Sequence, residues 1–246
     1  MQRYANHHNA GDEKTAVPQR YTVRHLGMTH LVLALFCCSL GLSTTALQAQ
    51  SPVQSNVQSQ MQNNDLNKIF QQLAATAIVR ANFEQKKQLT GVNKSFVSNG
   101  SVVFSKAEGV LWKMQRPVQA DLIVTQHKLV QKTQRSMSQI AVDKSPYASV
   151  ATMFLQLMAG NSQAIAQNFD VVSVQYTPQQ WKISLTPKSN LFKKLFVRVD
   201  AVGGRYVDHL LITEQGQNST AIRFTGQSSQ PQQLTAHENA LFQLAK

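Results

Sequence analysis

The chain has 246 residues, of which 24 are Lys or Arg and 12 are Asp or Glu, so its formal net charge is +12. Only 15% of the residues are charged and 42% are hydrophobic, which excludes a highly charged disordered chain and allows a sizeable core. The two cysteines are adjacent, which excludes a disulfide scaffold. The one continuous apolar run, residues 31–42, is too short for a polytopic membrane protein.

The first 49 residues have the order of a secretory signal peptide. Arg20 and Arg24 precede the apolar run at 31–42, and small and polar residues follow it up to Ala49. We expect cleavage after Ala49, with Ala46 as the alternative, and an uncleaved N-terminal anchor is the competing interpretation.

Cleavage after residue 49 would set the length, cysteine content and charge of the mature chain. It leaves 197 residues without a cysteine, so the exported protein must depend on a real core. It removes four Lys or Arg and two Asp or Glu, which leaves a charge of +10. For an exported protein this charge favours an anionic lipid surface over nucleic acid as partner. The alternative is that it only keeps the protein soluble.

A polar leader and a helix are predicted next. Residues 50–64 are rich in Gln, Ser and Asn, which predicts a flexible leader. Apolar residues then recur at helical spacing, which predicts an amphipathic helix from about Asp65 to Val79 with Asn64 or Asp65 as its N-cap. The apolar stripe of this helix consists of Leu66, Ile69, Phe70 and Leu73.

From Ala81 onward the hydrophobic period changes to two, which predicts strands. Short turn signals separate the segments, and short connections predict antiparallel neighbours. The tail at 234–245 is expected to be irregular or a terminal strand. The predicted strands are residues 83–89, 101–104, 109–114, 120–125, 128–132, 136–141, 169–176, 180–186, 195–202, 206–214 and 220–225.

A second helix interrupts the strands. Ser145 is a good N-cap, Pro146 suits the first helical position, and Gly160 suits the position just after the helix. The apolar stripe consists of Tyr147, Val150, Phe154 and Leu157, with Met153 and Met158 beside it. The count predicts one mainly β (α+β) domain over residues 65–246. A single sheet of about eleven antiparallel strands must curl, and helices covering its open mouth would line an apolar cavity.

The sequence shows no catalytic or metal-binding motif. His127, His209 and His237 lie in different segments without the spacing of metal ligands. No nucleophile elbow, phosphate-binding loop or dinucleotide fingerprint is present. We therefore expect a protein that is not an enzyme and that has no metal site and no cofactor.

The segment Leu191–Phe196 alternates apolar and basic residues and is predicted as a strand. Its two lysines either protect a sheet edge from pairing or contact anionic head groups.

Several short motifs occur in a fixed order over residues 66–242. They are residues 81–86, 100–104, 109–117, 122–125, 185–188 and the hairpin from 210–214 to 222–224. In this order, behind a signal peptide, they resemble the LolA-like family of periplasmic lipoprotein carriers. The resemblance implies an unclosed antiparallel barrel with a helical lid over an apolar cavity that holds acyl chains.

Two departures indicate a divergent branch of that family. Classical members carry an Arg-Pro pair before the tryptophan, where Lys106 and Ala107 stand here. Lysine keeps the charge but not the planar fork of arginine. The usual Asp-Gly turn is replaced by Gln126 and His127. The resemblance thus implies Lys106 as the lid-holding residue, and it leaves the cargo open between a lipoprotein and another acylated molecule.

The resemblance also implies a function. It is that of a monomeric periplasmic carrier, which takes an acylated lipoprotein or other lipid from an inner-membrane donor complex to an outer-membrane acceptor. A periplasmic sensor or scaffold that binds a protein partner with the same fold is the alternative.

A carrier of this kind must supply apolar surface. A sixteen-carbon chain represents on the order of 12 kcal/mol in water, at about 0.8 kcal/mol per methylene. Alternation does not tell which strand face is concave, so each candidate is equally well explained as plain core. The predicted lipid-binding residues are Val102, Phe104, Val110, Trp112, Met114, Leu122, Val124, Tyr147, Val150, Phe154 and Leu157.

Overall fold

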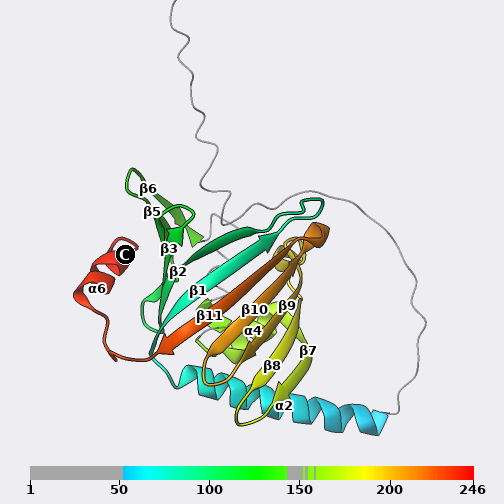
Figure 1. Ribbon diagram of the computed structural model, residues 1–246. Helices are drawn as coiled ribbons and strands as arrows, with labels where there is room; N and C mark the ends of the chain where they lie inside the picture. Colours follow the sequence, from blue (N-terminus) through cyan, green and yellow to red (C-terminus); the bar gives the residue numbers. More distant parts are fainter. Residues whose placement is uncertain (1–51, 143–151, 153–154, 158) are drawn as a thin grey trace, which may run out of the picture. The chain divides into compact units, whose positions relative to one another are not determined.

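The computed structural model describes residues 52–142, 152, 155–157 and 159–246 (Figure 1). The predicted signal peptide lies outside the described residues. So do three of the predicted lipid-binding residues, Tyr147, Val150 and Phe154.

The fold is one unclosed antiparallel sheet of eleven strands, as predicted. The strand order is β6-β5-β4-β3-β2-β1-β11-β10-β9-β8-β7, so the first and last strands of the chain pair at the centre, and β6 and β7 are the edges. The strands are β1 (Ile78–Gln88), β2 (Phe96–Ser105), β3 (Gly109–Arg116), β4 (Ala120–Val124), β5 (Lys128–Lys132), β6 (Met137–Ala141), β7 (Phe169–Tyr176), β8 (Trp181–Pro187), β9 (Phe196–Gly203), β10 (Val207–Glu214) and β11 (Ser219–Ser228).

The first described helix, α2 (Pro52–Ala74), differs from the prediction at both ends. It begins at Pro52, a favoured residue at the first helical position, so the segment predicted as a flexible leader is helical there. Residues 53–64 contain no Gly or Pro that would break a helix. The helix ends at Ala74 rather than Val79, because Ile78 and Val79 already belong to β1.

The prediction of a strand over Leu191–Phe196 is wrong for its first part, which forms the short helix α5 (Asn190–Lys193). The Ser189 side chain caps this helix by accepting a hydrogen bond from the Phe192 backbone N–H. Phe192 is buried between Phe169 and Phe196, with ring centroids 5.5 and 6.1 Å away. Burial of this ring favours a short helix over a strand in this segment.

The chain ends in a helix, α6 (Ala236–Gln243), where an irregular tail or a strand was predicted. Thr235 and Glu238 form a capping box, in which each side chain accepts a hydrogen bond from the other residue's backbone N–H. Two further short helices among the described residues are α4 (Ser162–Asn168) and the 3-10 turn η2 (Gln215–Gln217).

The pairing register assigns the strand residues to two faces. We call the face that carries Phe83 the inner face and the opposite face the outer face. Apolar residues of α2 lie against the inner face, where Leu73 and Phe224 line the same small cavity. Helix α6 packs on the outer face of β1–β5 (Figure 1). The outer-face core consists of Ile78, Val103, Leu111, Ile123, Val130, Leu241, Phe242 and Ala245.

Candidate functional site

The seven strand residues predicted to bind lipid all lie on the inner face. Val102 pairs with Trp112, and Trp112 pairs with Leu122. Residues paired across strands project to the same side of a sheet, and so do residues two apart on one strand. The register therefore brings together Val102, Phe104, Val110, Trp112, Met114, Leu122 and Val124.

Aromatic rings form the centre of the inner face. The Phe83 and Trp112 ring centroids are 4.0 Å apart, and Phe224 meets Trp112 edge-on at 6.1 Å. Because β1 and β11 are the central strands, these rings join the two halves of the sheet. Trp112 and Leu122 are half-buried, whereas the other five predicted strand residues are buried.

Helix α2 fills the space beside this face. Its residues Ile69, Phe70 and Leu73 are buried, as the predicted apolar stripe requires. The cavity between Leu73 and the sheet has a volume of only about 20 Å³, room for about one water molecule. This space is too small for an acyl chain in the arrangement described here.

Lys106, the predicted lid-holding residue, contacts the end of α2. Its Nζ donates a hydrogen bond to the Ala74 carbonyl at 3.1 Å, and its backbone N–H donates to the Ala77 carbonyl at 2.9 Å. A cation at the carbonyl end of a helix is favourable because the last carbonyls carry partial negative charge. Gln72 adds a second polar contact, from its Nε2 to the Gly204 carbonyl.

A second helical segment lies next to the same end of α2. Residues 155–157 are helical, and Leu155 and Leu157 are buried. Gly160 has φ +67°, as expected for the residue just after a helix. A Cβ atom at Gly160 would lie 2.4 Å from the Phe70 carbonyl oxygen, so this glycine allows the segment to approach α2 closely.

A cleft of about 350 Å³ opens where these parts meet. Its lining includes Ala74, Phe104, Lys106, Leu155 and Gly160. The cleft therefore joins the inner face, the end of α2 and the second helical segment.

Sequence reasoning missed an ion pair on the inner face. The Lys87 ammonium is bound to the Glu214 carboxylate, which also accepts a hydrogen bond from Thr220 Oγ1 at 2.7 Å. The Lys87 and Glu214 side chains are 14% and 5% exposed. Alternation along β1 places Lys87 on the same face as Phe83, and this was the available signal.

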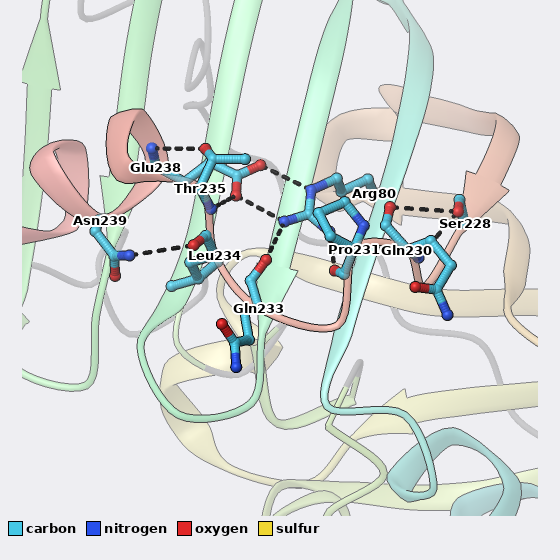
Figure 2. Close-up of polar contacts among 9 residues, drawn as sticks. All are labelled: Arg80, Ser228, Gln230, Pro231, Gln233, Leu234, Thr235, Glu238 and Asn239. Atoms are coloured by element: carbon cyan, nitrogen blue, oxygen red, sulfur yellow. Dashed lines mark hydrogen bonds and ion pairs between the residues drawn. The ribbon is translucent and has the colours of Figure 1, made fainter.

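The outer-face helix is fixed by a dense polar network (Figure 2). Arg80 donates from Nε and Nη2 to the two carboxylate oxygens of Glu238 at 2.8 and 2.7 Å. The same guanidinium donates to the carbonyls of Pro231 and Gln233 at 2.7 and 3.0 Å. Hydrogen bonding from Arg80 lowers the pKa of Glu238 below its usual range. The network therefore holds both the cap of α6 and the strap that leads to it.

No metal site is present among the described residues, where no group of three or more His, Cys, Asp or Glu could hold an ion. In the same part of the chain, no helix combines the length and the apolar character needed to cross a bilayer.

Comparison with known proteins shows the family of this chain. Residues 74–244 match the family described as outer membrane lipoprotein carrier protein LolA. The chain belongs to the LolA family. The match covers β1 to β11 and α6, and it begins at the last residue of α2. No curated protein matches the chain.

Solved structures with related folds are distant in sequence. A LolA superfamily protein from Nitrosomonas europaea is 7% identical, with a TM-score of 0.41 over 68% of this chain and 92% of the other. A putative outer membrane lipoprotein-sorting protein domain from Vibrio parahaemolyticus is 9% identical, with a TM-score of 0.42 over 72% and 97%. The MucA/MucB complex of Pseudomonas aeruginosa contains a chain that is 9% identical, with a TM-score of 0.40 over 72% and 62%.

Proposed function

We propose that this LolA-family protein binds the acyl chains of a lipoprotein or another lipid on its inner face and ferries them from the inner to the outer membrane. The observation that carries the proposal is the shared face of the seven predicted strand residues, two of which, Val102 and Phe104, line a small cavity together with Leu73 of α2. The proposal includes export by cleavage of residues 1–49, a periplasmic monomer, an inner-membrane donor and an outer-membrane acceptor.

In such an exchange the apolar contacts of the helix offset part of the free energy of binding the cargo. Burying one large apolar side chain contributes about 1.5–3 kcal/mol, so Ile69, Phe70 and Leu73 together contribute about 5–9 kcal/mol to the closed state. A sixteen-carbon chain in the same place would contribute on the order of 12 kcal/mol. The cargo can therefore displace the helix. When the cargo leaves, burial of the apolar side chains of α2 again offsets part of the free energy of release.

Binding of a protein partner is the second candidate function. It is favoured by β6, an edge strand whose residues are all exposed and include Met137 and Ile140. An exposed edge strand is a template for pairing with another chain. A sensor or scaffold would use this edge, whereas a carrier would use the inner face.

The first test is native mass spectrometry of the protein purified from its own periplasm, followed by lipid analysis. The carrier proposal predicts a bound acylated species that disappears on extraction. It also predicts uptake of a fluorescent fatty acid by the emptied protein. An empty protein that takes up no fatty acid would overturn the carrier proposal and favour partner binding.

A matched pair of variants locates the binding face. Leu122→Gln places an amide on the inner face, and Leu211→Gln places the same group on the outer face, where Leu211 is exposed. We expect weaker fatty-acid uptake, by about tenfold, only in Leu122→Gln, since an unpaired amide in an apolar site costs about 1–3 kcal/mol. Equal uptake by the two variants would place the lipid elsewhere.

A further inference from the structure

Three connections at one end of the sheet are hydrogen-bonded to one another. Thr90, in the loop between β1 and β2, donates from its backbone N–H to Asn218 Oδ1 at 2.9 Å and from Oγ1 to the Gly216 carbonyl at 2.7 Å. Gln215 donates from its backbone N–H to the Leu195 carbonyl at 3.1 Å. We call residues 89–97, 188–195 and 215–218 the rim.

The rim presents large apolar side chains to solvent. The exposed fractions are 39% for Val92, 48% for Phe96, 45% for Val97 and 37% for Leu191. Phe96 is the one aromatic among the large exposed hydrophobic residues of the described chain. Exposed apolar side chains on neighbouring connections at one end of a sheet are candidates for an interaction site.

The charge of the rim has one sign. Its three segments contain Lys94, Lys188, Lys193 and Lys194 and no Asp or Glu. The carboxylate next to the rim in the chain, Glu214, is buried and already bound to Lys87. The rim therefore combines apolar tips with uncompensated positive charge.

We propose that the rim docks on a bilayer surface that contains anionic lipids, with Val92, Phe96 and Val97 in the head-group layer. Apolar residues flanked by lysines are the pattern of a segment that lies in a membrane interface. Each lysine near an anionic leaflet contributes about 1 kcal/mol, and its methylene stem can lie along apolar surface while the ammonium meets phosphate. This role goes beyond acyl binding, because it concerns the connections at one end of the sheet and none of the seven predicted lipid-binding strand residues.

The same contact explains the pattern of Leu191–Phe196. Helix α5 buries Phe192 and leaves Leu191, Lys193 and Lys194 exposed. A strand would have placed one lysine on each face, whereas the helix presents both to solvent. The fold thus turns a short alternating motif into one basic and apolar patch.

The test is co-sedimentation of the protein, purified from the periplasm, with vesicles. We expect binding to mixed phosphatidylglycerol–phosphatidylcholine vesicles, weaker binding as salt rises, and little binding to pure phosphatidylcholine. The double variant Lys193→Gln/Lys194→Gln should bind about 25-fold more weakly, at about fivefold per lysine. The double variant Phe96→Ser/Val97→Ser should also bind at least several-fold more weakly.

Matched controls exclude a general charge or hydrophobicity effect. Lys182→Gln/Arg223→Gln removes two exposed charges on other strands, and Leu211→Ser removes an exposed apolar side chain from the outer face. Both controls should bind vesicles like the unmodified protein. If the rim variants and the control variants lost vesicle binding equally, the proposal would be overturned.

Absence of vesicle binding by the unmodified protein would also overturn it. In that case the alternative occupant of the rim would be an acidic protein. Fatty-acid uptake by the Lys193→Gln/Lys194→Gln variant should stay unchanged, so failure of the docking proposal is distinguishable from failure of the carrier proposal.

Discussion

A helix lies against part of each face of the sheet, but the two helices are held in different ways. On the outer face, the Arg80–Glu238 pair joins α6 to the sheet, and two further Arg80 hydrogen bonds hold the segment that leads to it. A capping box fixes the start of the helix itself. On the inner face, α2 is buried through an apolar stripe. Its polar contacts with the sheet include an exposed lysine at its last carbonyl.

Under the proposed function, we interpret α6 as a permanent part of the core and α2 as the part that the cargo displaces. Charge-assisted hydrogen bonds are directional and fix one geometry, whereas apolar contact can be replaced by any chain of similar volume. We therefore expect α6 to report on global stability and α2 on ligand exchange. Four predictions test this contrast, beginning with the largest expected effect.

Phe242→Ala should destabilise the protein by about 3–5 kcal/mol, because the ring is 1% exposed in the outer-face core. Urea unfolding measures the change, with Phe96→Ala, an exposed position, as the control expected within about 0.5 kcal/mol. The fraction that remains folded should take up fatty acid normally. Loss of uptake in folded Phe242→Ala protein would contradict the separation of the two faces.

Glu238→Gln should cost about 1.5–3 kcal/mol, since hydrogen bonds to charged groups contribute this much. The pKa of Glu238 is lower in the folded protein than in the unfolded chain, so its contribution is present above the unfolded value and is lost as pH falls through the folded one. Acid titration of the unfolding free energy should thus be steeper for the unmodified protein than for Glu238→Gln. Identical slopes would show that the pair contributes nothing at neutral pH.

Gly160→Ala should act on the inner-face helices and cost about 1–3 kcal/mol, since alanine at φ +67° is strained and its Cβ would meet the Phe70 carbonyl. We expect faster fatty-acid exchange in stopped-flow measurements. Gly91→Ala, which also has a positive φ but open space around it, is the control for strain alone. Equal exchange rates in the two variants would show that the close contact at Gly160 has no role in lid opening.

Lys106→Glu should have the smallest effect on stability, about 0.3–1 kcal/mol, because the side chain is exposed at a helix end. It should nevertheless impair loading or release of cargo, since a carboxylate repels the α2 carbonyl that the lysine now holds. Transfer assays with an acylated cargo measure this, and Lys106→Arg should preserve function. If Lys106→Glu transferred cargo as well as the unmodified protein does, the lid-holding role would be excluded.

Much of this fold could be predicted from alternation, because a half-buried strand shows its period in the sequence. The segment Gly109–Met114 is an example, with Val110, Trp112 and Met114 on one face. Alternation did not say which face is the inner one. That required the register, in which Val102 meets Trp112 and Trp112 meets Leu122.

The missed elements are short helices, whose signals are weak for physical reasons. Helix α6 has eight residues, too few for a clear period, although Thr235 and Glu238 already had the spacing of a capping box. Helix α5 has four residues and depends on burial of Phe192 between two rings from other strands. Such a contact between distant segments leaves no local pattern in the sequence.

The central pairing of β1 with β11 has a consequence for how the chain folds. Lys87 of β1 pairs with Thr220, about 130 positions later, whereas the other neighbours in the sheet are consecutive strands. Two meanders, β1–β6 and β7–β11, can form from local contacts, but joining them requires closure of a long loop. When the chain is synthesised from its N-terminus, one edge of β1 stays unpaired until β11 has been made. Such an unpaired edge is prone to aggregation. The interval between the formation of these two strands is therefore the stage of folding at which we expect aggregation to be most frequent.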